Sequence, residues 1–546
     1  MGTAILWLSS LAPPLLIVAF IMALTVKIKR FHIGFILTIL LALVPLIAGV
    51  GGTVFAYRWS GPKLPWLFGY TLSWTLVYLF GVVVILRRGM RLREQESFAC
   101  SWSRGKLAVS FVAALVLCLC VLLMLNNTTN IKLSVIRSDA VSIALTLQPS
   151  QVPDHLNASL VYEKAFEAMD KMKWPDWMRD VGEPAFDLSK NEVQEFLEGE
   201  KEAIASLQRA ASMPVYYSEI NYLKGEIPHL ISYRNAAGLL SLNARLRAEE
   251  GEMQVALNNI SAIRGMADHL KTIPSIITSM MSAAIQDAGT RTAENILSRG
   301  RDISAGALGT PIDNAVDLRQ AFNEALRMEE AFMAFTSVSY LSTNSLDSWC
   351  PVAELLYRAL LLYDELVSAR KIMLEANTIA TKPYWESVDD WKAWEESVEG
   401  FRGLITAIAM PAYGRGMEIK ILAAEAGGNL THLALAASAY KADHGVYPDK
   451  IEALTPRYMT TIPVDPFSGG PLKLASIQDG LMLYSVGPDL KDDGGINDYG
   501  INLGNRDMNQ GDITFVMGSA FEDRRLKPSK ESLEKRVKKD KSRPKK

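Results

Sequence analysis

RNAAGLLSLNARLRAEEGEMQVALNNISAIRGMADHL, residues 234–270, repeats apolar side chains at the spacing of an α-helix. Two such faces are separated by Glu250–Gly251, a pair that favours a turn, so the stretch predicts two amphipathic helices joined as a hairpin. The apolar faces consist of Leu239, Leu240, Leu242, Leu246, Val255, Leu257, Ile260 and Ile263.

The same pattern continues on both sides of the hairpin, from about Leu156 to Glu425, with Pro and Gly breaks and few strand-like runs. The hairpin, with its turn and the small Ala256, resembles one tetratricopeptide unit. A second copy at a spacing of 34 residues is not found, so an irregular helical bundle is the preferred interpretation. Six tryptophans could line a groove or fill the core, and core packing is preferred for Trp174, Trp177, Trp349, Trp385, Trp391 and Trp394.

The N-terminal part of the chain has a different composition, because long uncharged apolar runs replace the mixed pattern. A helix that crosses a bilayer needs about 20 apolar residues. Four runs approach that length, namely Ala4–Val26, Ile33–Tyr57, Pro65–Leu86 and Leu107–Leu125. None carries Asp, Glu, Lys, Arg or His, which favours an anchor in the lipid bilayer over a transporter.

Basic residues in the loops between these runs predict the orientation. The first loop holds Lys27, Lys29 and Arg30. The second holds two basic residues and the third holds six, Arg87, Arg88, Arg91, Arg93, Arg104 and Lys106. Loops rich in Lys and Arg stay in the cytoplasm. The sequence therefore predicts a multi-pass protein of a bacterial cytoplasmic (inner) membrane, with the N-terminus and everything after Asn126 outside the cytoplasm.

The segment Asn429–Phe515 predicts a small α+β module. A helix ends near Gly445, which suits a C-terminal cap, and Pro448 prevents its continuation. Three runs then have the length and composition of strands, at Leu472–Leu474, Leu481–Ser485 and Ile513–Val516. We expect one helix packed on a small antiparallel sheet.

This segment resembles the globular domain of the major pseudopilin of type II secretion systems. The matching residues are Tyr440, Asp443, Gly445, Tyr447, Pro448, Asp465, Pro466, Gly469, Pro471, Tyr484, Ser485, Gly487, Pro488 and Asp489. The resemblance covers about 90 of 546 residues and implies a module rather than a whole-protein function. The layout of the whole chain resembles uncharacterised multi-span membrane proteins of Planctomycetes-type bacteria. A pseudopilin carries a single N-terminal hydrophobic helix, so assembly of this multi-span chain into a filament is not expected.

The pseudopilin resemblance implies a calcium site in the loop before the last strand. That loop reads GPDLKDDGGIND and offers Asp489, Asp492, Asp493 and Asp498. Carboxylates on a flexible loop suit calcium, although the spacing is not that of an EF-hand. The alternative is a solvated acidic turn, and calcium is the single cofactor predicted.

Enzymatic signatures are missing from the sequence. The patterns GxxxxGK[ST], HExxH, GxSxG and GxGxxG do not occur, and the SxxK match at Ser438–Lys441 lacks its SDN and KTG partners. The sequence indicates no catalytic residue. The preferred hypothesis is a non-enzymatic membrane-anchored envelope protein that binds other proteins, with a link to secretion or surface assembly. The alternative is an extracytoplasmic enzyme acting on cell-wall or surface polymers through a cleft that the sequence does not reveal.

These observations divide the chain into four parts. We expect a four-helix transmembrane anchor at 1–126, an α-helical extracytoplasmic domain at 127–425, a pseudopilin-like α+β module at 426–520 and a basic disordered tail at 521–546. The expected partners are the lipid bilayer and envelope or secretion proteins. Nucleic acid is not expected, because the basic tail is predicted to lie outside the cytoplasm.

Overall fold

The computed structural model describes residues 104–179, 188, 191–226, 229–300, 303, 316–343, 362–400, 414–477, 480–495 and 511–518. The first three expected spans and the tail lie outside these residues. The fourth, Leu107–Leu125, falls in helix α4 (Arg104–Leu147), whose side chains are described only at 120 and from 123 onward. Among the described residues, no helix combines the length and apolar character needed to cross a membrane.

The chain divides into two compact units. The first contains Met1–Ala140, Met333–Ile372 and Glu395–Ala412, and the second contains Val141–Phe332, Met373–Trp394 and Tyr413–Lys546. In the first unit, the Arg137 guanidinium lies over the Phe335 ring at 4.9 Å from its centroid. The neighbouring Asp139 pairs with Arg370 at 3.6 Å. In the described part of this unit, α4 therefore contacts two later helices.

The second unit contains the hairpin that the sequence predicts. Its helices are α8 (Leu230–Glu249) and α9 (Met253–Leu270). The backbone N–H of Glu252 donates to the Arg247 carbonyl at 2.8 Å, and that of Gly251 donates to the Ala248 carbonyl at 3.2 Å. This pair of bonds is the Schellman motif, and it places Gly251 at φ 85°, where a side chain would be strained.

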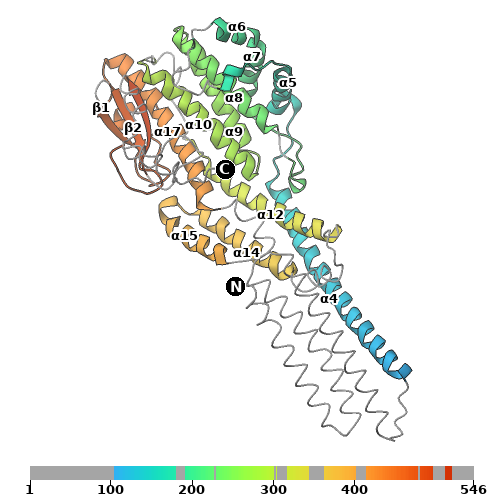
Figure 1. Ribbon diagram of the computed structural model, residues 1–546. Coiled ribbons are helices and arrows are strands. Elements are labelled where there is room, and N and C mark those ends of the chain that lie inside the picture. Colours follow the sequence, from blue (N-terminus) through green and yellow to red (C-terminus); the bar gives the residue numbers. More distant parts are fainter. Residues whose placement is uncertain are drawn as a thin grey trace, which may run out of the picture. The chain divides into compact units, whose positions relative to one another are not determined.

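Further helices pack around this hairpin (Figure 1). Helix α7 contacts α5 and α9, while α10 contacts α8, α9 and α17. Their bounds are α5 (Ala158–Asp170), α6 (Asn191–Gly199), α7 (Lys201–Ala211), α10 (Ile276–Ser298) and α17 (Arg415–His444). The other helices are α12 (Arg319–Thr343), α14 (Leu362–Thr381) and α15 (Tyr384–Gly400), with 3-10 turns at Asp154–Leu156, Asp176–Arg179, Tyr222–Lys224 and Ile451–Leu454.

Glycines allow α10 and α17 to approach closely. A Cβ on Gly428 would lie 2.6 Å from the Gln286 side chain and 2.6 Å from that of Val316, and one on Gly427 would press on Thr290 at 3.3 Å. Side chains at these positions would push the helices apart. At the same crossing, the Thr431 hydroxyl of α17 donates a hydrogen bond to the Thr290 hydroxyl of α10 at 3.2 Å.

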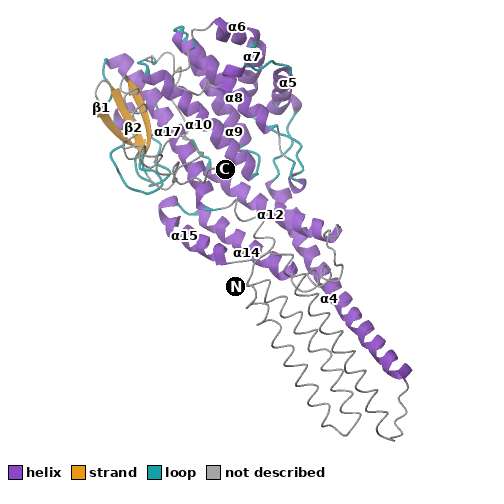
Figure 2. Cartoon of the chain, in the orientation of Figure 1, coloured by secondary structure: helices purple, strands orange, loops and turns teal. Residues whose placement is uncertain are grey.

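A three-stranded antiparallel sheet, in the order β1-β2-β3, lies beside the end of α17 (Figure 2). Its strands are β1 (Lys473–Ile477), β2 (Gly480–Ser485) and β3 (Ile513–Gly518). The expected runs Leu481–Ser485 and Ile513–Val516 lie within β2 and β3, whereas β1 begins one residue after the start of the expected run Leu472–Leu474 and continues to Ile477. Leu483 pairs with Leu474 on one side and Phe515 on the other. Leu481, Leu483 and Phe515 share one buried cluster with the apolar face of α17.

The helical part and the sheet share one core. Buried Glu294 of α10 accepts a hydrogen bond from the Val516 backbone N–H on edge strand β3 at 3.2 Å, so a helix supplies the partner that a fourth strand would otherwise provide. Helix α17 also runs without a break through the boundary expected between 425 and 426.

A buried carboxylate connects α15, α12 and α17. Glu418 pairs with Arg319 at 3.0 Å and accepts a hydrogen bond from the Trp391 indole at 2.5 Å. The Trp391 ring also packs edge-on against Trp394, with centroids 5.5 Å apart. These two tryptophans therefore lie in the core, the use that the sequence favours.

Candidate functional site

In the loop predicted to bind calcium, Asp489 and Asp492 accept hydrogen bonds from backbone groups of the loop, and Asp492 also contacts side chains of β1 and β2. Asp489 accepts hydrogen bonds from the Lys491 N–H at 3.2 Å and the Gly511 N–H at 3.4 Å. Asp492 accepts from the Gly494 N–H and from the Tyr484 hydroxyl, each at 3.1 Å. The bond from Gly494 is the main reason that the pKa of Asp492 is lowered.

A carboxylate that sequence reasoning missed organises this loop. Buried Asp512, directly before β3, accepts hydrogen bonds from Gly495 N–H at 2.7 Å and Asp493 N–H at 3.5 Å. Burial raises its pKa. Within the described residues, no three Asp, Glu, His or Cys side chains gather as metal ligands would. Asp498 lies outside the described residues, so the calcium site stays a prediction.

The residues that carry the pseudopilin resemblance connect two turns through one buried side chain. Asp465 is fully buried and accepts hydrogen bonds from the backbone N–H groups of Phe467 at 3.0 Å and Val486 at 3.1 Å. Its third donor is the Ser485 hydroxyl at 2.8 Å. Asp465 therefore joins the turn before β1 to the loop after β2, and its role is structural.

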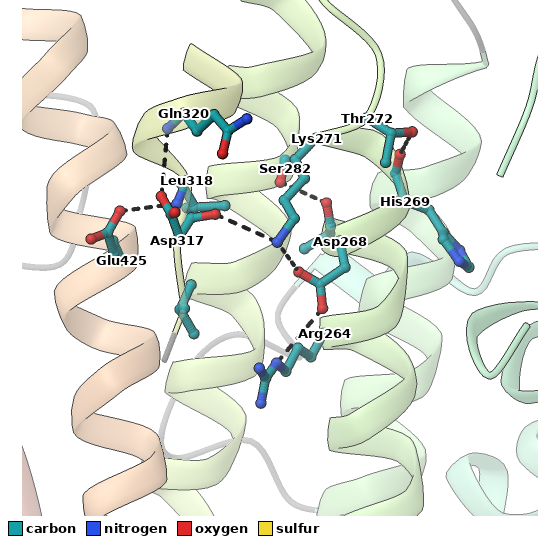
Figure 3. Close-up of polar contacts among 12 residues, drawn as sticks. Arg264, Asp268, His269, Lys271, Thr272, Ser282, Asp317, Leu318, Gln320 and Glu425 are labelled. Atoms are coloured by element: carbon teal, nitrogen blue, oxygen red, sulfur yellow. Dashed lines mark hydrogen bonds and ion pairs between the residues drawn. The ribbon is translucent and has the colours of Figure 1, made fainter. Parts of the chain in front are cut away.

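A second polar cluster surrounds the start of α12 (Figure 3). Asp317 accepts the Arg319 N–H at 3.1 Å, and Glu425 of α17 accepts the Leu318 N–H at 2.9 Å. Two carboxylates therefore cap the positive end of this helix. Burial nevertheless raises the pKa of Glu425 to about 7, so its carboxyl group titrates near neutral pH.

The α9 side of this cluster is basic. Asp268 pairs with Lys271 at 2.7 Å and with Arg264 at 3.7 Å (Figure 3). Arg264 also donates to the Nε2 atom of His432 on α17. Burial and the Arg264 charge lower the pKa of His432 to about 3, so this imidazole is a neutral acceptor. The cluster ties α9 and α12 to α17, and its groups are engaged in packing the fold.

The second unit also contains a cavity of about 290 Å³. Four of its lining residues come from α5 and have the spacing of one helix face, Ser159, Tyr162, Glu163 and Phe166. The segment between α7 and α8 closes the opposite side, together with the first turn of α8. These contribute Tyr216, Ser218, Glu219, Ile220, Glu226, His229 and Tyr233. We call these eleven residues the tyrosine pocket.

A short set of local bonds positions the pocket walls. The Asn157 side chain caps α5 by accepting the Ser159 N–H at 3.1 Å, and it also accepts the Tyr217 N–H at 2.9 Å. The Ser159 hydroxyl donates to the Tyr217 carbonyl at 2.6 Å. Because one asparagine holds both segments, the start of α5 and the Tyr216–Ile220 wall are fixed relative to each other.

Aromatic rings form the floor of the tyrosine pocket. Tyr233 lies 5.2 Å from Tyr162 and 4.8 Å from Phe166 between ring centroids, with tilted or edge-on geometry. Tyr216 lies 6.3 Å from Tyr162. Burial raises the pKa of all three tyrosines, so they remain protonated at neutral pH.

A histidine behind the floor fixes one of these hydroxyls. His269 contacts the Met213 carbonyl through Nε2 and the Tyr162 hydroxyl through Nδ1, each at 3.0 Å. A carbonyl can only accept, so Nε2 carries the proton and Nδ1 accepts from Tyr162. Burial lowers the pKa of His269, which keeps the ring neutral.

Acidic side chains lie at the rim of the tyrosine pocket. Glu163, Glu219 and Glu226 are exposed, as is His229. Glu226 also accepts the Asn221 N–H at 3.0 Å, which closes the loop that leads into α8. The site thus combines a protonated aromatic floor with a negatively charged entrance.

The sequence favours core packing over a groove for the six tryptophans, and those that the structure describes do not line this pocket. Core packing is wrong for Trp385, which is 42% exposed. Trp174 and Trp177 pack against Phe196, with centroids 6.3 and 5.5 Å away. Trp349 lies outside the described residues. The available signal was the tyrosine-rich, non-helical run VYYSEINYLKGE at 215–226, together with the SxxYExxF spacing that begins at Ser159. Neither pattern predicts a pocket by itself, because the pocket forms only where the two segments pack together.

Comparison with known proteins found no matching family model, no similar curated protein and no similar solved structure.

Proposed function

We propose that this chain is a non-enzymatic, membrane-anchored envelope protein whose helical domain binds other proteins outside the cytoplasm. Four uncharged apolar runs in the first 125 residues support the anchor. The excess of Lys and Arg in the first and third loops supports the orientation. The partner class follows from the terminal module, because its resemblance to a major pseudopilin supports a link to secretion or surface assembly.

The tyrosine pocket is the observation that carries the proposal of binding. Its hydroxyl groups stay protonated because burial raises the pKa of Tyr162, Tyr216 and Tyr233, so they are poor nucleophiles and poor bases at neutral pH. Both ring nitrogens of His269 are already bonded. A concave aromatic surface with a few polar groups is suited to recognition.

Site-specific photo-crosslinking in cells tests this proposal. The crosslinker is placed at Asn221, an exposed residue beside the rim of the tyrosine pocket, and as a matched control at Glu195, an exposed residue of α6 outside it. We expect mass spectrometry to recover the same envelope protein repeatedly from position 221 and not from position 195. Identical recovery from both positions, or no recovered envelope protein under any growth condition, would contradict the proposal.

A further inference from the structure

The lining of the tyrosine pocket has an unbalanced charge. Glu163, Glu219 and Glu226 contribute three carboxylates, and His229 is the one histidine among the described lining residues. Among the described residues, neither Lys nor Arg lines the cavity. The potential at the entrance therefore attracts cations and repels anions such as phosphate or carboxylate.

The aromatic floor favours the same kind of ligand. The faces of aromatic rings attract an organic cation, and the attraction grows when the cation leaves water. Four rings, those of Tyr162, Phe166, Tyr216 and Tyr233, line a cavity that is partly enclosed. Tyr162 and Phe166 lie nearly parallel, with centroids 5.8 Å apart, whereas Tyr216 is tilted against Tyr162 and Tyr233 is tilted or edge-on to both, so the rings present walls at more than one angle.

The hydroxyl groups of the pocket favour a primary ammonium over a quaternary ammonium. The Tyr162 hydroxyl is bonded to His269 and the Ser159 hydroxyl to the Tyr217 carbonyl. Ser218 and Tyr216 are further lining residues with hydroxyl oxygens, whose lone pairs can accept hydrogen bonds. A primary ammonium group brings three N–H donors, whereas a quaternary ammonium brings none. We propose that the tyrosine pocket binds the primary ammonium end of an alkyl chain, as carried by a lysine side chain or a polyamine.

The dimensions of the cavity agree with a ligand of this size. A volume of about 290 Å³ is at the lower end for ligand sites and suits a chain end better than a whole polymer unit. The three glutamates do not gather as metal ligands in the described residues. This inference rests on the proposed binding function and specifies the chemical group that a partner would insert.

The test is a titration of the purified full chain, in an uncharged maltoside detergent, followed by ligand-observed NMR. The probes are n-butylammonium, the neutral 1-butanol, tetramethylammonium and butyrate. We expect n-butylammonium to bind at least about tenfold more tightly than each of the other three, and added salt to weaken its binding. Spermidine, compared with a short lysine peptide, then distinguishes a free polyamine from a protein side chain.

Variants locate the binding to the tyrosine pocket. Combined substitution Glu163→Gln, Glu219→Gln and Glu226→Gln should weaken n-butylammonium binding about tenfold, since each exposed carboxylate contributes a factor of a few. All three residues are exposed, and Gln at position 226 keeps an oxygen for the Asn221 N–H, so the thermal midpoint should stay unchanged and show that the variant is folded. The control Glu195→Gln should bind like the parent protein.

Three results would overturn the inference. Equal binding of 1-butanol would mean that the cavity selects apolar groups without regard to charge. Equal or tighter binding of tetramethylammonium would show that N–H donors are not recognised. Unchanged affinity in the triple variant would place the binding elsewhere. A specific crosslink from position 221 alongside any of these results would leave the proposed function standing and reject only the ammonium ligand.

Discussion

Replacing Asp465 with alanine should destabilise the sheet end of the second unit by at least about 3 kcal/mol. The substitution removes the acceptor of three donors, the N–H groups of Phe467 and Val486 and the Ser485 hydroxyl. The side chain is fully buried, so water does not replace it, and each unsatisfied donor costs about 1–3 kcal/mol. The measurement is hydrogen–deuterium exchange of the β2 amides together with thermal unfolding of the full chain.

A matched control uses Asp449, an exposed aspartate in the turn region after α17. Asp449→Ala should change stability by less than about 0.5 kcal/mol. If Asp465→Ala unfolds at the same temperature as Asp449→Ala and its β2 amides exchange no faster, the connection between the two turns contributes little, and the structural role assigned to Asp465 is wrong.

The second large effect concerns the pH dependence of stability at Glu425. Its folded pKa of about 7 lies above the ordinary glutamate value of 4.5. The folded state therefore holds the proton more tightly than the unfolded state. The resulting stabilisation is fully present below about pH 4.5 and is lost as the pH rises through about 7. Glu425→Gln stays neutral and keeps an oxygen for the Leu318 N–H, so this loss disappears.

We therefore expect Glu425→Gln to match the parent protein near pH 4.5 and to be more stable by about 1–3 kcal/mol at pH 8. Denaturant unfolding of both proteins across this range gives the difference, with Glu195→Gln as the exposed control. A stability difference that stays constant from pH 4.5 to pH 8 would contradict the raised pKa of Glu425.

Local signals in the sequence explain the part of the fold that could be predicted. The turn at Glu250–Gly251 requires a left-handed residue, and Gly445 ends α17 in the same conformation, at φ 78°. The three strands could be located because each is a short apolar run followed by turn residues. These features depend on neighbours within a few positions of the chain.

The candidate site could not be predicted, because its residues meet only through packing. Tyr162 and Tyr233 lie on different helices, and the hydrogen bond of Tyr162 with His269 spans 107 positions of sequence. The bond from Val516 to Glu294 spans 222 positions. In the acidic loop, the sequence pointed to the cluster of Asp and Gly residues. The buried acceptor is instead Asp512, which has only a single glycine before it and therefore does not stand out in the sequence.

The anchored orientation with the binding domain outside the cytoplasm is the central claim, and a pair of reporter fusions tests it most directly. An enzyme that is active only outside the cytoplasm is fused after Thr129 in one protein and after Arg93 in another. The charge bias of the loops predicts activity after Thr129 and none after Arg93. Activity after Arg93 with none after Thr129 would place the helical domain and its tyrosine pocket in the cytoplasm and contradict the account.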